Sequence, residues 1–222
     1  MTILAIETSG STFSIALNID GTVVIHFFYS YAQHIHSEII IPTIKQLLKQ
    51  AGYNIKNIDK FAISIGPGSF TGIRIGITIF RLFAQVLNKK IIPVDTLSIL
   101  ESSLNLKTKN IKIVPAIVAS KEEIYIRNNN NLTNKFCIEL KNINEFIAEL
   151  KKYKRKILII GNAAILYKKQ FCEALGKFSV SLPYIMHIPS AYYLSLIAYN
   201  ASDSQYIDYN NILPFYVKTV FK

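Results

Sequence analysis

Residues 64–76 read SIGPGSFTGIRIG, and this glycine-rich stretch lies between two apolar segments. The segment before it, 61–65, is a short apolar run of the kind that forms a buried strand, whereas the segment after it, 73–87, is long enough for a helix. Glycine and proline between two such segments predict a tight turn from strand to helix. We expect the turn to be formed by the following residues: Gly66, Pro67, Gly68 and Gly72.

The spacing of these glycines excludes the two common phosphate-binding loops. A P-loop needs a lysine directly after its second glycine, and G-x-G-x-x-G needs a glycine where Thr71 stands. The N-terminus of the helix still predicts a generic anion site, to which Ser69, Thr71 and Arg74 would add polar contacts. The structural alternative is that Gly72 and Gly76, four residues apart on one helical face, let another element approach closely. We favour this alternative for those two glycines, although both uses can coexist.

The helix after the turn carries two apolar stripes. One consists of Ile73, Ile77, Phe80, Ala84 and Leu87, and the other of Ile75, Ile79, Leu82, Phe83 and Val86. A helix that is apolar on two sides is buried on two sides, so we expect its own sheet to cover one stripe and a further element to cover the other. The neighbouring amphipathic helix, 37–51, would supply part of that cover and a partner subunit the rest. The predicted partner interface therefore comprises residues from both helices: Ile40, Ile44, Leu47, Ile75, Ile79, Leu82, Phe83 and Val86.

The order of predicted elements indicates two related lobes. In the first half we expect strands at 3–6, 13–18, 23–28, 61–65 and 91–94 and helices at 37–51, 71–87 and 96–106. Asp20-Gly21 predicts a hairpin between the second and third strands. In the second half we expect strands at 113–118, 123–127, 135–140 and 156–160, helices at 144–152, 163–175 and 191–201, and an asparagine-rich turn at 127–134. Two β-β-β-α-β-α-type lobes, the second reduced, predict an α/β protein with the actin-like ATPase fold, also called the ASKHA or RNase H-like fold.

We place the lobes at residues 1–106 and 107–222, because the polar segment 105–110 separates them. The last helix and the tail, about 190–222, would pack back on the first lobe.

The net charge of +11, from 25 Lys and Arg against 14 Asp and Glu, indicates an acidic partner such as RNA or an acidic protein. The lysines are nevertheless interpreted as spread along the chain, as compositional drift would leave them. The densest cluster, KKYKRK at 151–156, is typical of the solvated end of a helix, and clustered charge without stacking aromatics is weak evidence for nucleic-acid binding. Direct binding of nucleic acid by this chain alone is therefore not the favoured interpretation.

The sequence provides little for metal or redox chemistry. Cys137 and Cys172 are far apart and have no C-x-x-C partner, and His34 and His36 do not have the spacing of a helical ligand pair. The start of the chain lacks the features of a signal peptide, and arginines interrupt the longest apolar segment. We expect no metal site, no membrane span and a cytoplasmic protein.

An ATPase of the actin-like architecture needs a carboxylate in each lobe to hold its metal ion and orient water. Glu7 is well placed for this at the end of the first strand, but the equivalent place in the second half, 118–120, has no acid before Glu122. Self-contained ATP hydrolysis is therefore not predicted. Ser69 does not fit G-x-S-x-G and has no marked histidine partner, which argues against a serine hydrolase.

Several motifs of the chain resemble the bacterial TsaB (YeaZ) family in order and spacing. They are ILAIETS, HSEIIIPTIKQLL, GPGSFTGIRIG, VDTLSIL, IVPAI, EEIY and LPFYVK, of which GPGSFTGIRIG is the most specific. The resemblance implies a non-catalytic protein of the actin-like fold that acts in synthesis of threonylcarbamoyladenosine at adenosine 37 of tRNA (t6A37). It also implies a heterodimer with a catalytic TsaD-type paralogue, cooperation with a TsaE-type ATPase, a homodimer when alone, and tRNA contact only through the complex.

The same resemblance implies no cofactor for the chain by itself, with ATP or ADP at the complex interface near Glu7, Ser69, Thr71 and Arg74. One segment departs from the family, because the usual D-A-R-x-G-E pattern is replaced by VASKEE at 118–123. Two alternatives stay open: a stand-alone small-molecule kinase or ATPase of the same fold, and a peptidase that acts on the TsaD-type partner.

Overall fold

A computed structural model describes residues 1–30, 37–104, 110–127, 138–153 and 156–216. These residues form two compact units, of which unit 1 comprises Met1–Ile99 with Pro189–Phe215 and unit 2 comprises Leu100–Ile188 with Tyr216–Lys222. The sequence predicts a boundary after residue 106 and a last helix and tail, about 190–222, that pack back on the first lobe; in the division above, Pro189–Phe215 belongs to unit 1. His34, His36 and Cys137, the polar segment 105–109 and most of the asparagine-rich turn lie outside the described residues.

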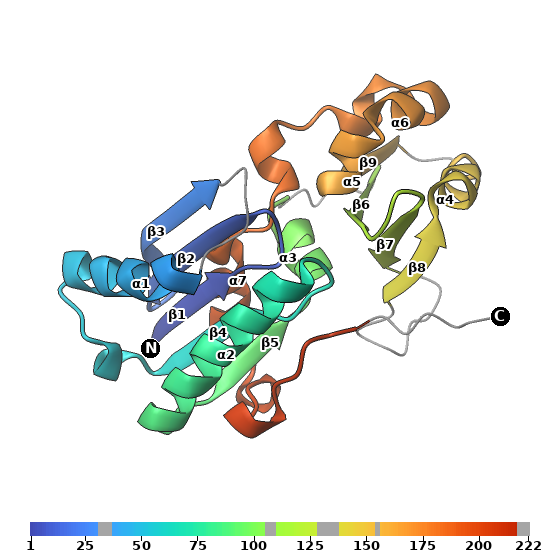
Figure 1. Ribbon diagram of the computed structural model, residues 1–222. Helices are drawn as coiled ribbons and strands as arrows, with labels where there is room; N and C mark the ends of the chain where they lie inside the picture. The colour runs from blue at the N-terminus through green and yellow to red at the C-terminus, as the bar shows by residue number, and fades with distance from the viewer. Residues whose placement is uncertain (31–36, 105–109, 128–137, 154–155, 217–222) are drawn as a thin grey trace. The chain divides into compact units, whose positions relative to one another are not determined.

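Unit 1 is built on a five-stranded sheet in the order β3-β2-β1-β4-β5 (Figure 1). Its strands are β1 (Thr2–Glu7), β2 (Thr12–Ile19), β3 (Thr22–Ser30), β4 (Lys60–Ser64) and β5 (Ile91–Val94). β1, β2 and β3 pair antiparallel, and β4 and β5 extend the sheet in parallel from β1. Asp20 and Gly21 have the positive φ angles, 49° and 87°, that a tight two-residue hairpin requires, so the predicted hairpin is confirmed.

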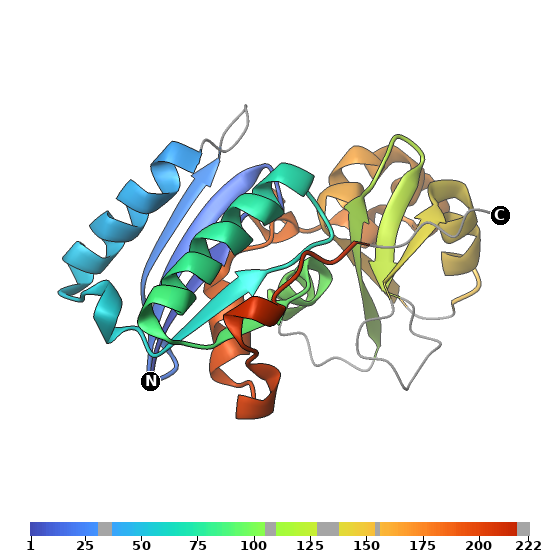
Figure 2. The same cartoon turned by 60° about the horizontal axis from the view of Figure 1, so that its bottom comes forward.

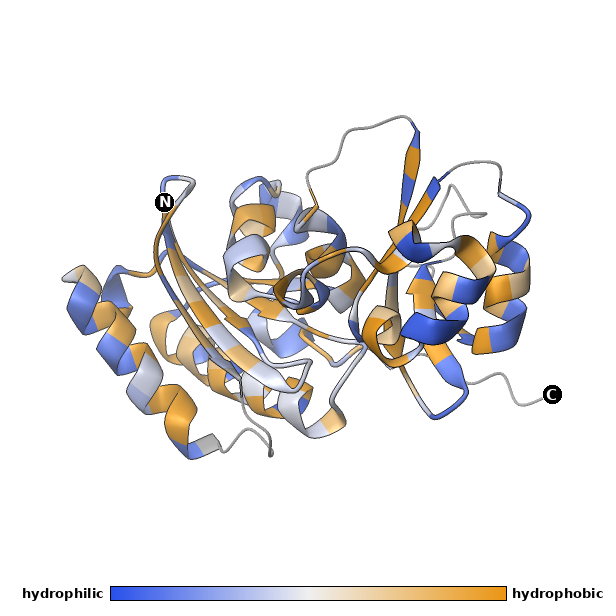
Figure 3. Cartoon of the chain, turned by 90° about the horizontal axis from the view of Figure 1, so that it is seen from above, coloured by the Kyte–Doolittle hydropathy of each residue, from blue (hydrophilic) through white to orange (hydrophobic). Residues whose placement is uncertain are grey.

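Helices cover both faces of this sheet. They are α1 (Ser37–Ala51) and α2 (Phe70–Leu87) on one face, and α3 (Thr96–Ser102) and α7 (Ala191–Tyr199) on the other (Figure 2). Alternate strand residues serve the two cores: Leu4 and Ile6 pack with α1 and α2, whereas Ile3 and Ala5 pack with α7. Because both faces are covered, the strands of this sheet are mostly apolar in Figure 3.

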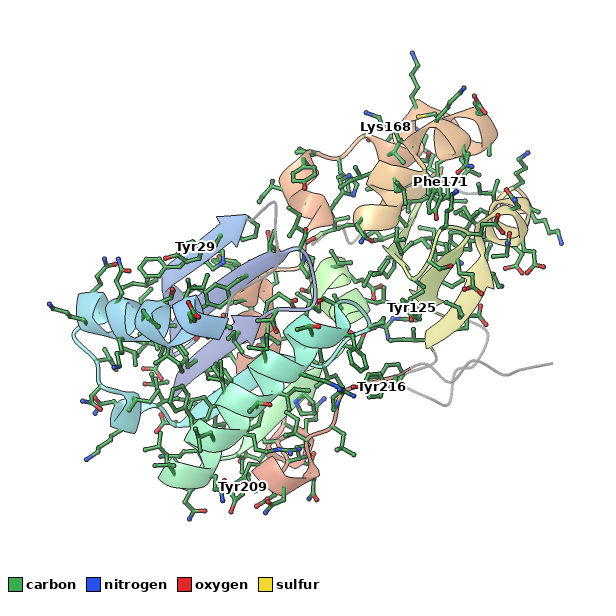
Figure 4. The ribbon with its side chains drawn as sticks, in the orientation of Figure 1. Tyr29, Tyr125, Lys168, Phe171, Tyr209 and Tyr216 are labelled. Atoms are coloured by element: carbon green, nitrogen blue, oxygen red, sulfur yellow. The ribbon has the colours of Figure 1, made fainter. Side chains whose placement is uncertain are left out.

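Unit 2 repeats this plan without a fifth strand. Its sheet has the order β8-β7-β6-β9, with β6 (Ile111–Val118), β7 (Glu123–Arg127), β8 (Ile138–Asn142) and β9 (Lys156–Ile160). The helices α4 (Ile143–Leu150), α5 (Asn162–Leu166) and α6 (Lys168–Leu175) accompany it. Phe171, labelled in Figure 4, is fully buried in the core of this unit. The predicted two-lobed fold with a reduced second lobe is therefore confirmed.

Three predicted helices differ in detail. The helix expected at 163–175 is two helices, because Tyr167 between them has φ −102° and ψ 24°. The helix expected at 96–106 ends at Ser102, and the one expected to end at residue 201 ends at Tyr199. Periodicity continues across such breaks, which is why it did not reveal them.

Candidate functional site

The glycine turn packs directly on the turn between β1 and β2. The Ser69 N–H donates a 2.6 Å hydrogen bond to the Ser9 carbonyl. A Cβ atom on Gly68 would lie 2.1 Å from the Ser9 carbonyl oxygen, and one on Gly72 would lie 2.1 Å from the Thr8 carbonyl oxygen. These distances leave no room for a side chain at either glycine.

Gly76 extends the same contact by one helical turn, since its Cβ would lie 2.5 Å from the Thr8 hydroxyl oxygen. The structural use that we favoured for Gly72 and Gly76 is therefore confirmed, and the element that approaches is the β1–β2 turn. The turn residues Gly66 and Pro67 are joined by a cis peptide bond, and Gly66 has a φ of 104°. The Gly66 carbonyl accepts a hydrogen bond from the Thr96 N–H, which connects the turn to the start of α3.

Glu7 lies at the end of β1 and is fully buried. The backbone N–H and the hydroxyl of Ser9 both donate to its Oε1 at 2.5 Å, and the Thr96 hydroxyl donates to Ser9 Oγ at 3.0 Å. Burial raises the pKa of the Glu7 carboxyl, and hydrogen bonding by Ser9 together with the nearby Ser64 opposes that rise only in part. Its other oxygen, Oε2, has no hydrogen-bond partner of good geometry among the described residues.

Glu7 is a buried carboxyl group in a low-polarity environment. It has no exposed surface in this conformation, and its raised pKa favours the neutral form. The predicted contact of Glu7 with a nucleotide stays a prediction.

The three other residues predicted to contact an anion lie at the start of α2. Ser69 is the N-cap of the helix, and its hydroxyl accepts a 3.2 Å hydrogen bond from the Gly72 N–H. Thr71 is exposed, and the Arg74 guanidinium lies 3.7 Å from the centre of the Phe70 ring. Part of the anion-binding capacity of this N-terminus is thus taken up within the chain, while Thr71 and Arg74 remain on the surface. Their contact with a nucleotide stays a prediction.

The two stripes of α2 differ in burial. Ile73, Ile77, Phe80 and Ala84 are buried against the sheet. In the second set, which we call the α2 stripe, Ile75, Ile79 and Phe83 are partly buried, and Leu82 and Val86 are 56% and 73% exposed. Part of an apolar helix surface therefore faces away from the core of unit 1.

The predicted contribution of α1 to a partner interface is wrong. Ile40, Ile44 and Leu47 are at most 2% exposed, and they belong to the core that α1 forms with α2 and the sheet. An amphipathic helix has a single apolar face, and α1 uses this face within its own unit. The opposite face of α1 presents Lys45, Gln46, Lys49 and Gln50.

By length and composition alone, α2 is long enough and apolar enough to span a membrane. Its buried stripe explains part of this apolar composition, because Ile73, Ile77 and Phe80 pack in the core of unit 1. The remaining apolar surface of α2 comprises the α2 stripe and the exposed Phe70 at its start.

Unit 2 has a tight turn where unit 1 has Glu7 and Ser9. The Tyr167 hydroxyl donates a 2.9 Å hydrogen bond to the Lys121 carbonyl, and the Val118 N–H donates to Asn162 Oδ1 at 2.8 Å. Glu122, the first acid in this segment, is exposed. The turn at 118–123, where the sequence departs from the family pattern, therefore presents backbone and surface groups and no buried carboxyl group. Among the described residues, no three His, Cys, Asp or Glu side chains are grouped as metal ligands would be.

The sequence of the chain is similar to those of known proteins. The family model TsaD, described as tRNA N6-adenosine threonylcarbamoyltransferase, matches residues 29–195. The tRNA threonylcarbamoyladenosine biosynthesis protein TsaB of Bacillus subtilis is 27% identical over 98% of this chain and 94% of its own length. TsaB of Buchnera aphidicola subsp. Schizaphis graminum is 34% identical over 72% of this chain and 78% of its own length.

A solved structure shows the same fold. YeaZ from Pseudomonas aeruginosa superposes with a TM-score of 0.75 at 22% identity, over 97% of this chain and 99% of that one. The family model covers well over half of the chain, and the Buchnera relative exceeds 30% identity over more than two thirds of it. The chain belongs to the TsaB (YeaZ) family of tRNA threonylcarbamoyladenosine biosynthesis proteins.

Proposed function

We propose that the chain is a non-catalytic subunit of the complex that makes t6A37 in tRNA, and that it binds a TsaD-type catalytic paralogue through the α2 stripe. The observation that carries this proposal is the exposure of Leu82 and Val86 on a helix whose other apolar side is already buried. An apolar strip on a rigid helix favours association with another apolar helix surface.

The fixed position of α2 supports the proposal. Three glycines of the helix start pack against Thr8 and Ser9, and Ser69 caps the first turn. At the other end, Asn88 adopts the left-handed conformation, and its N–H donates to the carbonyls of Ala84 and Gln85. A helix held at both ends presents its outer side chains with little loss of conformational freedom on binding.

The absence of catalysis is proposed from the two carboxyl positions. Glu7 is buried away from solvent, and the matching turn of unit 2 has Glu122 on its surface. A TsaD-type partner would therefore supply the metal site and the transfer chemistry, with a TsaE-type ATPase as a further partner. Any ATP or ADP would bind at the interface, where Thr71 and Arg74 are exposed. We further propose a homodimer through the same stripe when the partner is missing, and a cytoplasmic location.

The test is the t6A content of tRNA in cells depleted of their own TsaB protein. Wild-type chain should restore the modification, as measured by mass spectrometry of tRNA nucleosides, and Leu82→Asp should not. Ile185→Asp is a matched control, since Ile185 is 57% exposed against 56% for Leu82 and lies in unit 2. Full restoration by Leu82→Asp at equal protein level would remove the support for the α2 stripe.

A further inference from the structure

The positive charge of the chain is concentrated in one unit. Unit 2 contains 17 Lys and Arg against 7 Asp and Glu, a net charge of +10, whereas unit 1 contains 8 against 7, a net charge of +1. The interpretation that the lysines are spread along the chain is therefore wrong. The asymmetry is already visible along the sequence, because residues 1–106 have a net charge of +2 and residues 107–222 have a net charge of +9.

A pocket in unit 2 combines this charge with apolar surface. It has a volume of about 460 Å³, and its lining residues lie where α4 and α6 end and β9 begins. Residues that line it include Leu150, Lys151, Tyr153, Lys156, Leu175 and Phe178, and no Asp or Glu is among its lining residues. The fully buried Phe171 of α6, labelled in Figure 4, belongs to the core of the same unit.

Two aromatic rings of this pocket lie beside lysine side chains. The Lys112 ammonium is 3.6 Å from the centre of the Tyr153 ring, and the Lys156 ammonium is 5.4 Å from the centre of the Phe178 ring. Tyr153 is 43% exposed and Phe178 is 41% exposed. We interpreted the cluster at 151–156 as a solvated helix end without stacking aromatics, but it contains Tyr153 itself. The structure adds a second ring, Phe178, from a separate segment.

A simpler role accounts for only part of this arrangement. Lys151 is the C-cap residue of α4, where a cation interacts favourably with the helix dipole. That role does not explain two half-exposed rings beside lysines in one concave site. Cations for phosphates and rings for bases are the combination by which proteins bind single-stranded nucleic acid.

We propose that this pocket binds unpaired nucleotides of an RNA, with Lys151 and Lys156 contacting phosphates and Tyr153 and Phe178 stacking on bases. An acidic peptide would satisfy the lysines and leave the rings without a matching group, so RNA is the better fit. The choice of tRNA as the probe rests on the proposed function.

Fluorescence anisotropy of the full chain with a labelled, unmodified tRNA transcript tests the proposal. Titrations at several KCl concentrations would compare the wild type with Lys112→Ala/Lys151→Ala/Lys156→Ala. We expect this triple variant to bind at least about tenfold more weakly. The slope of log affinity against log salt should fall by about 1.4–1.8, because the phosphate contacts of Lys151 and Lys156 are lost and each contributes roughly 0.7–0.9. The matched control is Lys45→Ala/Lys49→Ala/Lys56→Ala in unit 1, which removes the same charge from exposed positions.

The rings are tested separately. Tyr153→Leu/Phe178→Leu should weaken binding about tenfold or more without changing the salt slope, because stacking is lost while the charges remain. Tyr184→Leu, at a residue that is 61% exposed in the same unit, should leave the affinity unchanged. Circular dichroism melting would verify that each variant is folded.

Three results would overturn the proposal: equal losses in the pocket and control triple variants, unchanged binding by the ring variant, or tighter binding of polyglutamate than of tRNA. The measurement needs no TsaD-type partner and no modification reaction. Its failure therefore leaves the proposed t6A role untouched, and failure to restore t6A in cells leaves the RNA pocket untouched.

Discussion

Replacing Gly72 by alanine has two opposing effects on stability: alanine has the higher helix propensity, but its Cβ atom would clash with a neighbouring turn. Gly72 lies in the first turn of α2, and in an exposed helix interior a change from glycine to alanine stabilises by roughly 0.5–1 kcal/mol. Here the new Cβ would lie 2.1 Å from the Thr8 carbonyl oxygen, whereas ordinary contact begins near 3.4 Å. The backbone must therefore separate by roughly 1.3 Å. The atom in the way belongs to the backbone and cannot rotate aside.

Overpacking of this kind costs about 1–3 kcal/mol, which exceeds the gain in helix propensity. We expect Gly72→Ala to lower the free energy of unfolding by about 1–2 kcal/mol and the melting temperature by about 2–8 °C. Urea and thermal unfolding would measure both. Gly10→Ala is the matched control, because the nearest atom to its Cβ would be at 3.7 Å and its φ is not positive. Gly72→Ala that is as stable as the wild type, or more so, would refute the close packing of the two turns.

Two further predictions concern Glu7 and Asn88. Because burial raises the pKa of Glu7, the folded state retains a proton on this carboxyl at pH values where the unfolded state has lost it. The free energy of unfolding of the wild type, relative to that of Glu7→Gln, should therefore fall as pH rises from about 4.5 through the raised pKa. Below that window it should stay level. Urea unfolding at stepped pH would show it, and a difference that grows in favour of the wild type with rising pH would contradict it. Asn88 has φ 51° and ψ 51°, so Asn88→Gly should be neutral or stabilising, whereas Asn88→Ala should cost about 1 kcal/mol. Equal melting temperatures for these two variants would count against the left-handed cap.

Local patterns predicted much of the fold. The limits of β5, β7 and β9, at Ile91–Val94, Glu123–Arg127 and Lys156–Ile160, follow from apolar runs bounded by polar residues or turns, and Asp20-Gly21 determines a hairpin. The two stripes of α2 were also visible as a 3.6-residue period, and their different burial agrees with it.

The rest of the site depends on tertiary contacts that the sequence does not display. Periodicity placed Ile40, Ile44 and Leu47 on an apolar face, but it did not say that this face packs within the chain's own unit. Likewise, nothing local shows that Thr8 would fill the space beside Gly72.

The pocket of unit 2 escaped sequence reasoning for a related reason. Lys151, Tyr153 and Lys156 belong to one segment, but Lys112 lies on β6 and Phe178 follows α6. The parallel pairing of β6 with β9, in which Lys112 lies opposite Ile157, brings β6 close to the segment 151–156. The sequence shows only Tyr153 within the cluster at 151–156, and the fold adds the Phe178 ring to the same pocket.

The central claim is that the α2 stripe is the surface by which the chain binds its TsaD-type partner. Light scattering on a size-exclusion column, with the chain alone and mixed with the TsaD-type protein of the same organism, tests it most directly. We predict a one-to-one complex for the wild type and for Ile185→Asp. Leu82→Asp should weaken it at least about 100-fold, because the leucine contact is lost and a charge is buried. A complex of undiminished stability with Leu82→Asp and Val86→Asp, or no complex with the wild type, would contradict the claim.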